Sequence, residues 1–253
     1  MSILRSILFM ALMVLLTPPC ALLLIVCFWL PAPARQSLVM PWVHASTWLI
    51  ENVLCIRTRV IGAENIPSVP VVVLSKHQSA WETIVLQHLF HRLIFVWKQE
   101  LKYVPFFGWA LAVTPSISID RSAGQDALRQ LHERGQQRLA EGYSIAIFPE
   151  GTRVAPGGKR RYKIGGASLA ATAGVPVVPV ALNSGEVWGR NAFFKRPGVV
   201  TISIGPAIDT RGLAAEAVNT RAERWIEGEM GRISPHLYPA QGNTTRATAG
   251  DRS

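Results

Sequence analysis

Residues 71–83 read VVVLSKHQSAWET, and this stretch joins a strand to a helix with few residues between them. Its first residues are apolar and mostly β-branched, without the polar alternation of a strand exposed on one face, so we expect a strand buried on both faces. Ser79 followed by Glu82 is a capping box, which marks the start of a helix. A buried strand that runs directly into a helix is typical of an α/β sheet.

Further β-rich runs lie on both sides of this unit, and helical patterns fall between several of them. The runs occupy residues 57–61, 93–97, 143–148, 175–182 and 199–204. The clearest helical pattern spans 124–142, with one face formed by Leu128, Leu131, Gly135 and Leu139. We therefore expect an α/β fold with a mostly parallel central sheet flanked by helices.

Length and composition bound the rest of the architecture. The chain has 253 residues, enough for one compact domain and an appendage. Hydrophobic residues make up 49% and charged residues 17%, which excludes intrinsic disorder for the body of the chain. We expect an N-terminal hydrophobic membrane-anchoring helical segment at 1–55, one domain at 56–239 and a disordered tail at 240–253.

The anchoring segment is the strongest compositional feature. No charged side chain occurs from Ser6 to Ala34, which exceeds the roughly 20 residues needed to cross a bilayer. Pro18 and Pro19 are expected to interrupt a helix here, so a kinked span and a re-entrant hairpin both fit. A cleaved signal peptide is a third interpretation, although the apolar run is about twice the usual length. A second helical pattern at 36–54 fits either a membrane surface or packing on the globular body.

Lys and Arg outnumber Asp and Glu by 26 to 16, so the formal net charge is +10. This balance favours an anionic partner, and on charge alone nucleic acid, anionic lipid and phosphorylated metabolites all qualify. The basic residues do not accompany a recognisable nucleic-acid-binding module, so we expect no nucleic-acid partner.

Two polar side chains at the 71–83 junction can carry chemistry. His77 follows the strand and Glu82 lies on the first turn of the helix, so the carboxylate can orient the imidazole and stabilise its protonated form. Glu82 also has a purely structural explanation, because the capping box uses the same side chain. Both roles can coexist, since a carboxylate has about four acceptor sites. The other histidines show no third ligand nearby, and we predict no metal site.

A second junction, YSIAIFPEGTR at 143–153, ends a strand in a turn that contains Glu150 and Arg153. A plain turn explains the Pro and Gly but not these charges. The basic loop that follows contains Lys159, Arg160, Arg161 and Lys163. A guanidinium beside such a cluster suits a phosphate monoester, and the alternative is a solvated basic surface near anionic headgroups.

Two further basic candidates are weaker. Arg121 follows Asp120 after a β-like run, and Lys102 lies with Lys98 among apolar and aromatic residues. A surface ion pair and core packing are the plain structural explanations. The sequence has neither a G-x-x-x-x-G-K-[ST] phosphate loop nor a G-x-S-x-G nucleophile elbow, so ATP-driven and serine-hydrolase functions lose support.

Four ordered blocks resemble the glycerolipid acyltransferase family, and most closely its bacterial 1-acyl-sn-glycerol-3-phosphate acyltransferases. They are His77-x4-Glu82, Ile119-Asp120-Arg121, FPEGTR at 148–153 and VPVVPV at 175–180. The likeness covers residues 57–205, and the ordered combination is more specific than any single block. The family usually has Asp where this chain has Glu82.

The resemblance implies roles for these residues. His77 would be the general base that takes a proton from the acceptor hydroxyl, with Glu82 orienting the imidazolium, and the hydroxyl would attack the acyl thioester directly. The acceptor would be bound by Glu150, Gly151, Thr152 and Arg153, with Arg121, Lys102 and Lys163 as further contacts. Arg153 and Arg121 would contact its phosphate. No cofactor is implied, since acyl-CoA or an acyl carrier protein supplies the acyl group as a substrate.

The resemblance also implies a membrane-lipid substrate, with the protein in the bacterial inner membrane and its site facing the cytoplasm. Our leading hypothesis is acylation of the sn-2 hydroxyl of lysophosphatidic acid, which gives phosphatidic acid. A second hypothesis keeps the chemistry but changes the acceptor to glycerol 3-phosphate, another lysophospholipid or a lyso-aminolipid. A third is a catalytically inactive, membrane-tethered protein that binds anionic lipid, in which His77 and Glu82 only cap a helix.

Overall fold

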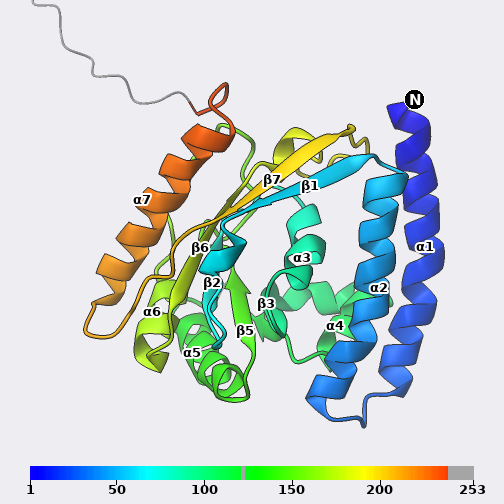
Figure 1. The fold of residues 1–253 in the computed structure, drawn as a ribbon. Helices are drawn as coiled ribbons and strands as arrows, with labels where there is room; N and C mark the ends of the chain where they lie inside the picture. Colours follow the sequence, from blue (N-terminus) through cyan, green and yellow to red (C-terminus); the bar gives the residue numbers. More distant parts are fainter. Residues whose placement is uncertain (121–122, 239–253) are drawn as a thin grey trace, which may run out of the picture.

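Seven strands form one sheet in the computed structural model, which describes residues 1–120 and 123–238 (Figure 1). The strands are β1 (Ile56–Ile61), β2 (Val72–Ser75), β3 (Leu93–Lys98), β4 (Ile117–Ile119), β5 (Ser144–Ile147), β6 (Val177–Leu182) and β7 (Gly198–Ile204). Their order is β1-β7-β6-β2-β5-β3-β4, and every neighbouring pair is parallel except β6 and β7. The predicted α/β fold with a mostly parallel sheet is confirmed, while the predicted tail at 240–253 lies outside the described residues.

Helices cover both faces of the sheet (Figure 1). One face carries α5 (Gln125–Ala140), α6 (Gly165–Ala173) and α7 (Ala215–Ile233), and the other carries α1 (Ser2–Val26), α2 (Ala32–Asn52), α3 (Trp81–Val85) and α4 (Phe107–Val113). Each face has its own apolar core, and the residues of β2 alternate between them. Val73 belongs to the core shared with α1, α2 and α3, whereas Val72 and Leu74 belong to the core shared with α5, α6 and α7. This explains why the strand lacks polar alternation.

The predicted helix at 124–142 is α5. Leu131, Gly135 and Leu139 are buried as the pattern predicts, whereas Leu128 is 37% exposed. A Cβ on Gly135 would lie 2.6 Å from Leu169 Cδ2, so glycine at this position lets α5 approach α6 closely.

The register of the central strands decides which residues meet where the parallel strands end. Leu74 of β2 pairs with Ile147 of β5. His77 and Glu150 lie the same distance beyond this pair in their own chains. Because parallel strands end at one edge of the sheet, the two junctions singled out in the sequence become neighbours.

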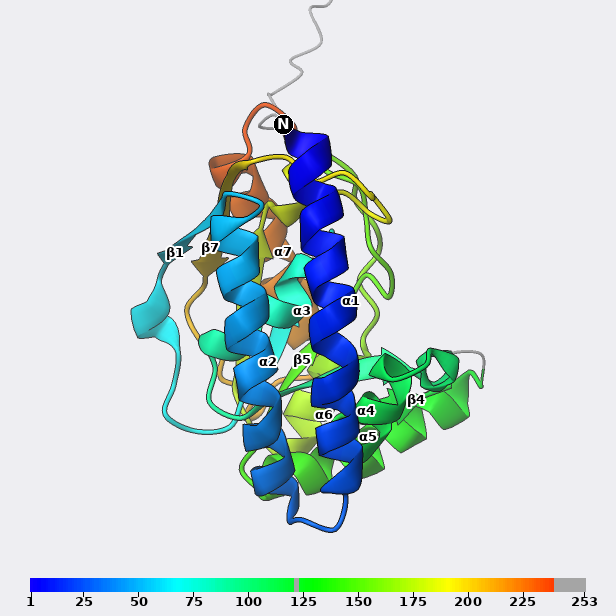
Figure 2. The ribbon, with the colours of Figure 1, turned by 90° about the vertical axis from the view of Figure 1, so that its right-hand side faces the viewer.

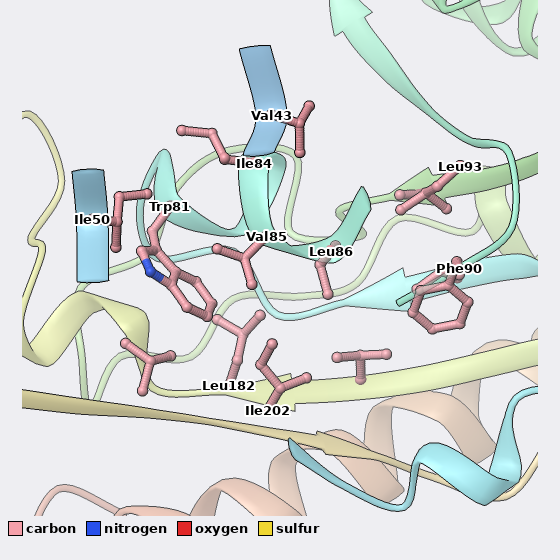
Figure 3. Packing of buried hydrophobic residues seen from close by; sticks show 14 of the residues in the cluster. Val43, Ile50, Trp81, Ile84, Val85, Leu86, Phe90, Leu93, Leu182 and Ile202 are labelled. Atoms are coloured by element: carbon pink, nitrogen blue, oxygen red, sulfur yellow. The ribbon is translucent and has the colours of Figure 1, made fainter. Parts of the chain in front are cut away.

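Helix α3 is fixed by deep burial of one face. Trp81 is fully buried and packs in the same core as Val85, Ile50 of α2 and Leu182 of β6 (Figure 3). Burial of a large apolar side chain contributes about 2 kcal/mol or more. The first turn of α3, which carries Glu82, therefore has little freedom to move.

The N-terminal segment is a hairpin of α1 and α2 (Figure 2). The prediction that Pro18 and Pro19 interrupt the first helix is wrong, because α1 runs through both. The prolines remove two backbone donors, yet α1 packs against α2 and α4, and Trp42 Nε1 donates a hydrogen bond to Thr17 Oγ1 directly before them. Tertiary contacts keep the helix continuous, and the chain reverses at 27–31 instead.

Within the part of the chain that the structure describes, α1 is the one helix long and apolar enough to cross a membrane. The mean hydropathy of its most apolar stretch is 2.5, and only 17% of that stretch is buried. The second helical pattern corresponds to α2, which packs on the globular body through Val43, Leu49 and Ile50, while Trp48 is 61% exposed. The anchoring role of 1–55 stays a prediction.

Candidate active site

His77 and Glu82 form a hydrogen-bonded pair where β2 meets α3. His77 Nδ1 lies 2.9 Å from Glu82 Oε1. A carboxylate only accepts hydrogen bonds, so Nδ1 carries the hydrogen, and Nε2 of the neutral ring is the nitrogen that can accept a proton. The ring stacks on Phe148 with 3.8 Å between centroids, and the His77 side chain is 14% exposed. The pair therefore has the orientation and the access that a general base requires.

The Glu82 carboxylate is fully buried and accepts five hydrogen bonds from the described residues. Oε1 accepts from His77 Nδ1 and from the backbone N–H groups of Gln78 and Ser79. Oε2 accepts from the hydroxyls of Ser79 and Ser184. Burial raises the pKa of this carboxyl, but the hydrogen bonds from His77 and the backbone outweigh burial, so its pKa lies below the ordinary value. Glu82 is ionised at neutral pH.

One carboxylate serves both the helix start and the pairing with His77. Glu82 Oε1 accepts the Ser79 N–H at 2.8 Å, which is one of the two bonds of a capping box, whereas Ser79 Oγ accepts the N–H of Trp81, at 2.8 Å, and not that of Glu82. Sequence reasoning missed Ser184, because its approach to Glu82 depends on the pairing of β6 with β2 and not on any local pattern.

The turn at 148–153 needs glycine at its centre. Gly151 has a φ of 71°, a left-handed conformation that disfavours other residues. A Cβ there would lie 3.0 Å from Lys163 Cε, so the glycine also makes room for that side chain. The backbone N–H of Lys163 donates to the Pro149 carbonyl at 2.8 Å, which holds the basic loop against the turn.

Glu150 differs from the expectation that it contacts an acceptor. Its side chain is fully buried, Oε1 lies 2.8 Å from Lys76 Nζ, and Oε2 accepts the backbone N–H of His77 at 2.9 Å. Burial raises the pKa of Glu150, and the Lys76 ammonium opposes that effect. The structure thus places this carboxylate on the His77 backbone, and its contact with an acceptor stays a prediction.

Arg153 lines a cavity beside His77 together with Gly151 and Thr152. Two residues that sequence reasoning missed, Arg190 and Asn191, line the same cavity. Arg190 Nη1 donates to the Arg153 carbonyl at 3.4 Å, and Arg153 Nη1 donates to Asn191 Oδ1 at 3.5 Å. The loop that carries Arg190 and Asn191 lies outside the four sequence blocks. Its basic charge was the only feature of the sequence that could have pointed to a place at the site.

Lys102 is not among the residues that line this cavity. Lys102 lies in a short 3-10 helix, η3 (Gln99–Tyr103), with Nζ 5.0 Å from the centroid of the Tyr103 ring. Lys98, which ends β3 at the carboxyl edge of the sheet, lines the cavity in its place. Arg121 lies outside the described residues.

The cavity has a volume of about 520 Å³ and is mostly apolar. Its apolar wall comes from α1, α2, α3, α4 and β3, and includes Ala21, Leu24, Leu38, Val39, Trp42, Ile84, Phe95, Phe107, Ala110 and Leu111. All residues of β3 from Leu93 to Lys98 contribute, so the cavity extends along the strand for about 16 Å. His77, Arg153 and Arg190 line the same cavity as this apolar wall.

The arrangement can remove a proton from a hydroxyl that is held near both an anion and an apolar chain. Within residues 1–120 and 123–238, no three His, Cys, Asp or Glu side chains converge as metal ligands do. The chemistry that these side chains themselves can supply is general-base catalysis.

Comparisons with known proteins place this chain in a family. The profile of the family described as Acyltransferase matches residues 57–183, about half of the chain. A 1-acyl-sn-glycerol-3-phosphate acyltransferase of Pseudomonas aeruginosa is 46% identical over 210 residues, which cover 81% of this chain and 82% of the relative. The human 1-acyl-sn-glycerol-3-phosphate acyltransferase alpha is 32% identical over 172 residues, 67% of this chain and 61% of the relative.

A solved structure shares the fold. The crystal structure of PlsC, the 1-acyl-sn-glycerophosphate acyltransferase of Thermotoga maritima, superposes with a TM-score of 0.76 at 21% identity, covering 91% of this chain and 95% of that chain. The sequence matches establish descent, and the shared fold agrees with them. The chain belongs to the acyltransferase family and is an enzyme of that family.

Proposed function

We propose that the protein transfers a fatty acyl group from an acyl thioester to the sn-2 hydroxyl of lysophosphatidic acid, giving phosphatidic acid. The relatives described above are named for acylation of 1-acyl-sn-glycerol 3-phosphate, which is lysophosphatidic acid. The observation that carries the proposal is the His77–Glu82 pair, which lies beside a mostly apolar cavity that Arg153 also lines.

In the proposed reaction, His77 Nε2 takes the proton of the acceptor hydroxyl as its oxygen attacks the thioester carbonyl. Glu82 holds the ring in the required tautomer and stabilises the imidazolium that forms. When the tetrahedral intermediate collapses, the carbon–sulfur bond breaks, and the imidazolium gives its proton to the departing thiolate. An ester and a free thiol result, and the protein returns to its starting state without an acyl-enzyme.

The acceptor phosphate would be bound by Arg153 and Arg190, with Lys163 nearby over Gly151. Guanidinium groups suit this role because they donate two parallel hydrogen bonds to phosphate oxygens. The acyl chain would lie in the apolar cavity. We propose acyl-CoA or an acyl carrier protein as the donor, and no cofactor.

The segment 1–55 would hold the active site at the membrane surface, close to its lipid substrate. Helix α1 presents a long apolar surface, and residues of both α1 and α2 line the cavity, so a lipid that leaves the membrane would enter beside His77. We propose that this membrane is the bacterial inner membrane and that the site faces the cytoplasm.

The test is acyl transfer by the detergent-purified protein with a labelled acyl-CoA or acyl carrier protein. The acceptors are lysophosphatidic acid, glycerol 3-phosphate and a neutral lysophospholipid. The wild type should acylate lysophosphatidic acid, and His77→Ala should lose that activity. His91→Ala is the matched control, because His91 is exposed and lies outside the cavity wall.

Each other result favours a different hypothesis. Preference for another acceptor would keep the chemistry and change the substrate. Full activity in His77→Ala would remove the general-base role. Salt-sensitive lipid binding without turnover on any acceptor or donor would favour the inactive anionic-lipid-binding protein.

A further inference from the structure

Lys76 is a fully buried lysine beside His77 that the proposed reaction does not use. It follows β2 directly, and its backbone N–H donates to the Val180 carbonyl at 2.9 Å. Because side chains alternate along a strand, Lys76 and His77 lie on opposite faces of the sheet. The imidazole lies on the cavity face, and the lysine extends toward α7, where it meets Glu227.

Three oxygen atoms of the described residues lie around the Lys76 ammonium. Nζ lies 2.8 Å from Glu150 Oε1, 2.7 Å from Glu227 Oε1 and 3.4 Å from the Gly158 carbonyl. These acceptors belong to the 148–153 turn, helix α7 and the basic loop, respectively. One buried cation therefore joins the end of β2 to two distant parts of the sequence, the stretch from Glu150 to Gly158 and helix α7.

The contact with Glu150 connects this cation to the proposed base. The second oxygen of Glu150 accepts the backbone N–H of His77 at 2.9 Å. A buried carboxylate without a counter-ion either takes up a proton or moves toward water. In both cases the hydrogen bond to the His77 amide would weaken, and the ring would lose its fixed position.

We propose that Lys76 is a positioning residue, which holds the Glu150 carboxylate on the His77 backbone and ties this pair to helix α7 through Glu227. The inference rests on the proposed function, because it assigns a purpose to the fixed position of His77. It also gives α7 a part in the active site, although the family match at 57–183 ends well before Ala215.

The decisive experiment compares Lys76→Met with the double variant Lys76→Met/Glu150→Gln. The single variant leaves Glu150 buried without its cation, so kcat should fall on the order of 10–100-fold, while KM for lysophosphatidic acid stays within about twofold. In the double variant a glutamine carbonyl can accept the His77 N–H without a counter-ion. About a tenfold recovery of kcat relative to Lys76→Met is expected.

The helix connection is tested by Glu227→Gln against Glu229→Gln. Both glutamates lie on α7 and make hydrogen bonds, but Glu229 pairs with Ser203 and Arg232, away from His77. Glu227→Gln should lower kcat on the order of fivefold, since one of the two ion pairs of Lys76 is lost. Glu229→Gln should leave kcat unchanged. Equal effects of the two variants would overturn the link to α7.

A merely structural role for Lys76 predicts a different pattern. Lower thermal stability with unchanged kcat in the folded fraction, or no recovery in the double variant, would overturn the inference. Failure of the wild type to acylate lysophosphatidic acid would instead overturn the proposed function. In that case the nitrogen resonances of 15N-labelled His77 decide independently: they should shift in Lys76→Met and return in the double variant, and an unchanged spectrum in the single variant would contradict the positioning role.

Discussion

His77 Nδ1 and Glu82 Oε1 lie 2.9 Å apart, although the Glu82 side chain is one methylene longer than the aspartate that is usual at this position of the family. The backbone N–H groups of Gln78 and Ser79 donate to the same oxygen at 2.6 and 2.8 Å. Three N–H donors thus converge on one oxygen atom. The glutamate side chain at position 82 is long enough to place its oxygen at that point.

Shortening this side chain should slow the reaction. In Glu82→Asp the carboxylate retreats from His77 while the buried α3 backbone stays in place, so kcat should fall on the order of 10–100-fold. The KM for lysophosphatidic acid should change little, because Glu82 does not line the cavity. Steady-state kinetics measure both. Glu229→Asp, a buried glutamate that bonds Ser203, is the control, and wild-type kcat in Glu82→Asp would contradict the length match.

The lowered pKa of Glu82 predicts how stability depends on pH. The folded-state pKa lies below the ordinary value of about 4.3, so the carboxylate stabilises the fold above that pH, and the contribution is lost as the pH falls through the folded-state pKa. Glu82→Gln should cost about 2 kcal/mol in free energy of unfolding at pH 7, since it weakens hydrogen bonds to a charged group. The difference between wild type and variant should shrink below about pH 4.

Denaturant unfolding of both proteins in detergent, at several pH values from 3 to 8, measures this difference. Subtracting the variant removes the contributions of the other carboxyl groups, which both proteins share. A difference that stays constant across the whole range would contradict the assignment.

Local patterns in the sequence correctly predicted those strands and helices whose formation depends on residues close together in the chain. The apolar run at 71–75 became β2, and Glu82 accepts the Ser79 N–H as the capping-box spacing implies, although Ser79 Oγ accepts the N–H of Trp81 and not that of Glu82. The order of strands and helices predicted an α/β sheet for the same reason.

Long-range contacts explain what the sequence left open. Helix α1 stays continuous at Pro18 and Pro19 because other helices pack against it, and no local rule contains that information. The negative charge of Glu150 suggested a residue that contacts a ligand, but its side chain is buried and forms an ion pair with Lys76. Arg190 reaches the cavity through the path of a loop, which no spacing in the sequence specifies.

Gly151 should tolerate no side chain. In Gly151→Ala a left-handed φ of 71° costs about 1 kcal/mol or more, and the new Cβ would lie 3.0 Å from Lys163 Cε. The lysine must move away from the turn, so KM for lysophosphatidic acid should rise severalfold beyond any loss of stability. Gly174→Ala is a matched control, because Gly174 has a φ of 66° but open space around its Cβ position. Equal KM values in the two variants would contradict a role for Lys163 at the site.

Arg190 should contribute to acceptor binding although it lies outside the four sequence blocks. Removing one charge-assisted contact to phosphate typically costs about 1.5–3 kcal/mol, so Arg190→Ala should raise KM for lysophosphatidic acid on the order of tenfold or more with a smaller change in kcat. Arg196→Ala, an exposed residue of the same loop outside the cavity wall, is the control. Unchanged acceptor kinetics in Arg190→Ala would exclude this contact.

Filling the apolar cavity should change which acyl chains the enzyme accepts. Ala110 lies on α4 and lines the cavity, so the ring in Ala110→Phe would occupy space that a long chain needs. Activity with long-chain donors should fall at least tenfold, whereas short-chain donors should be used nearly as well as by the wild type, because overpacking penalises only chains that reach the ring. Ala112→Phe is the control, since Ala112 is exposed on the same helix and lies outside the cavity wall. Competition between long and short acyl donors in one assay measures the preference, and an equal loss with both lengths would mean that the acyl chain binds elsewhere.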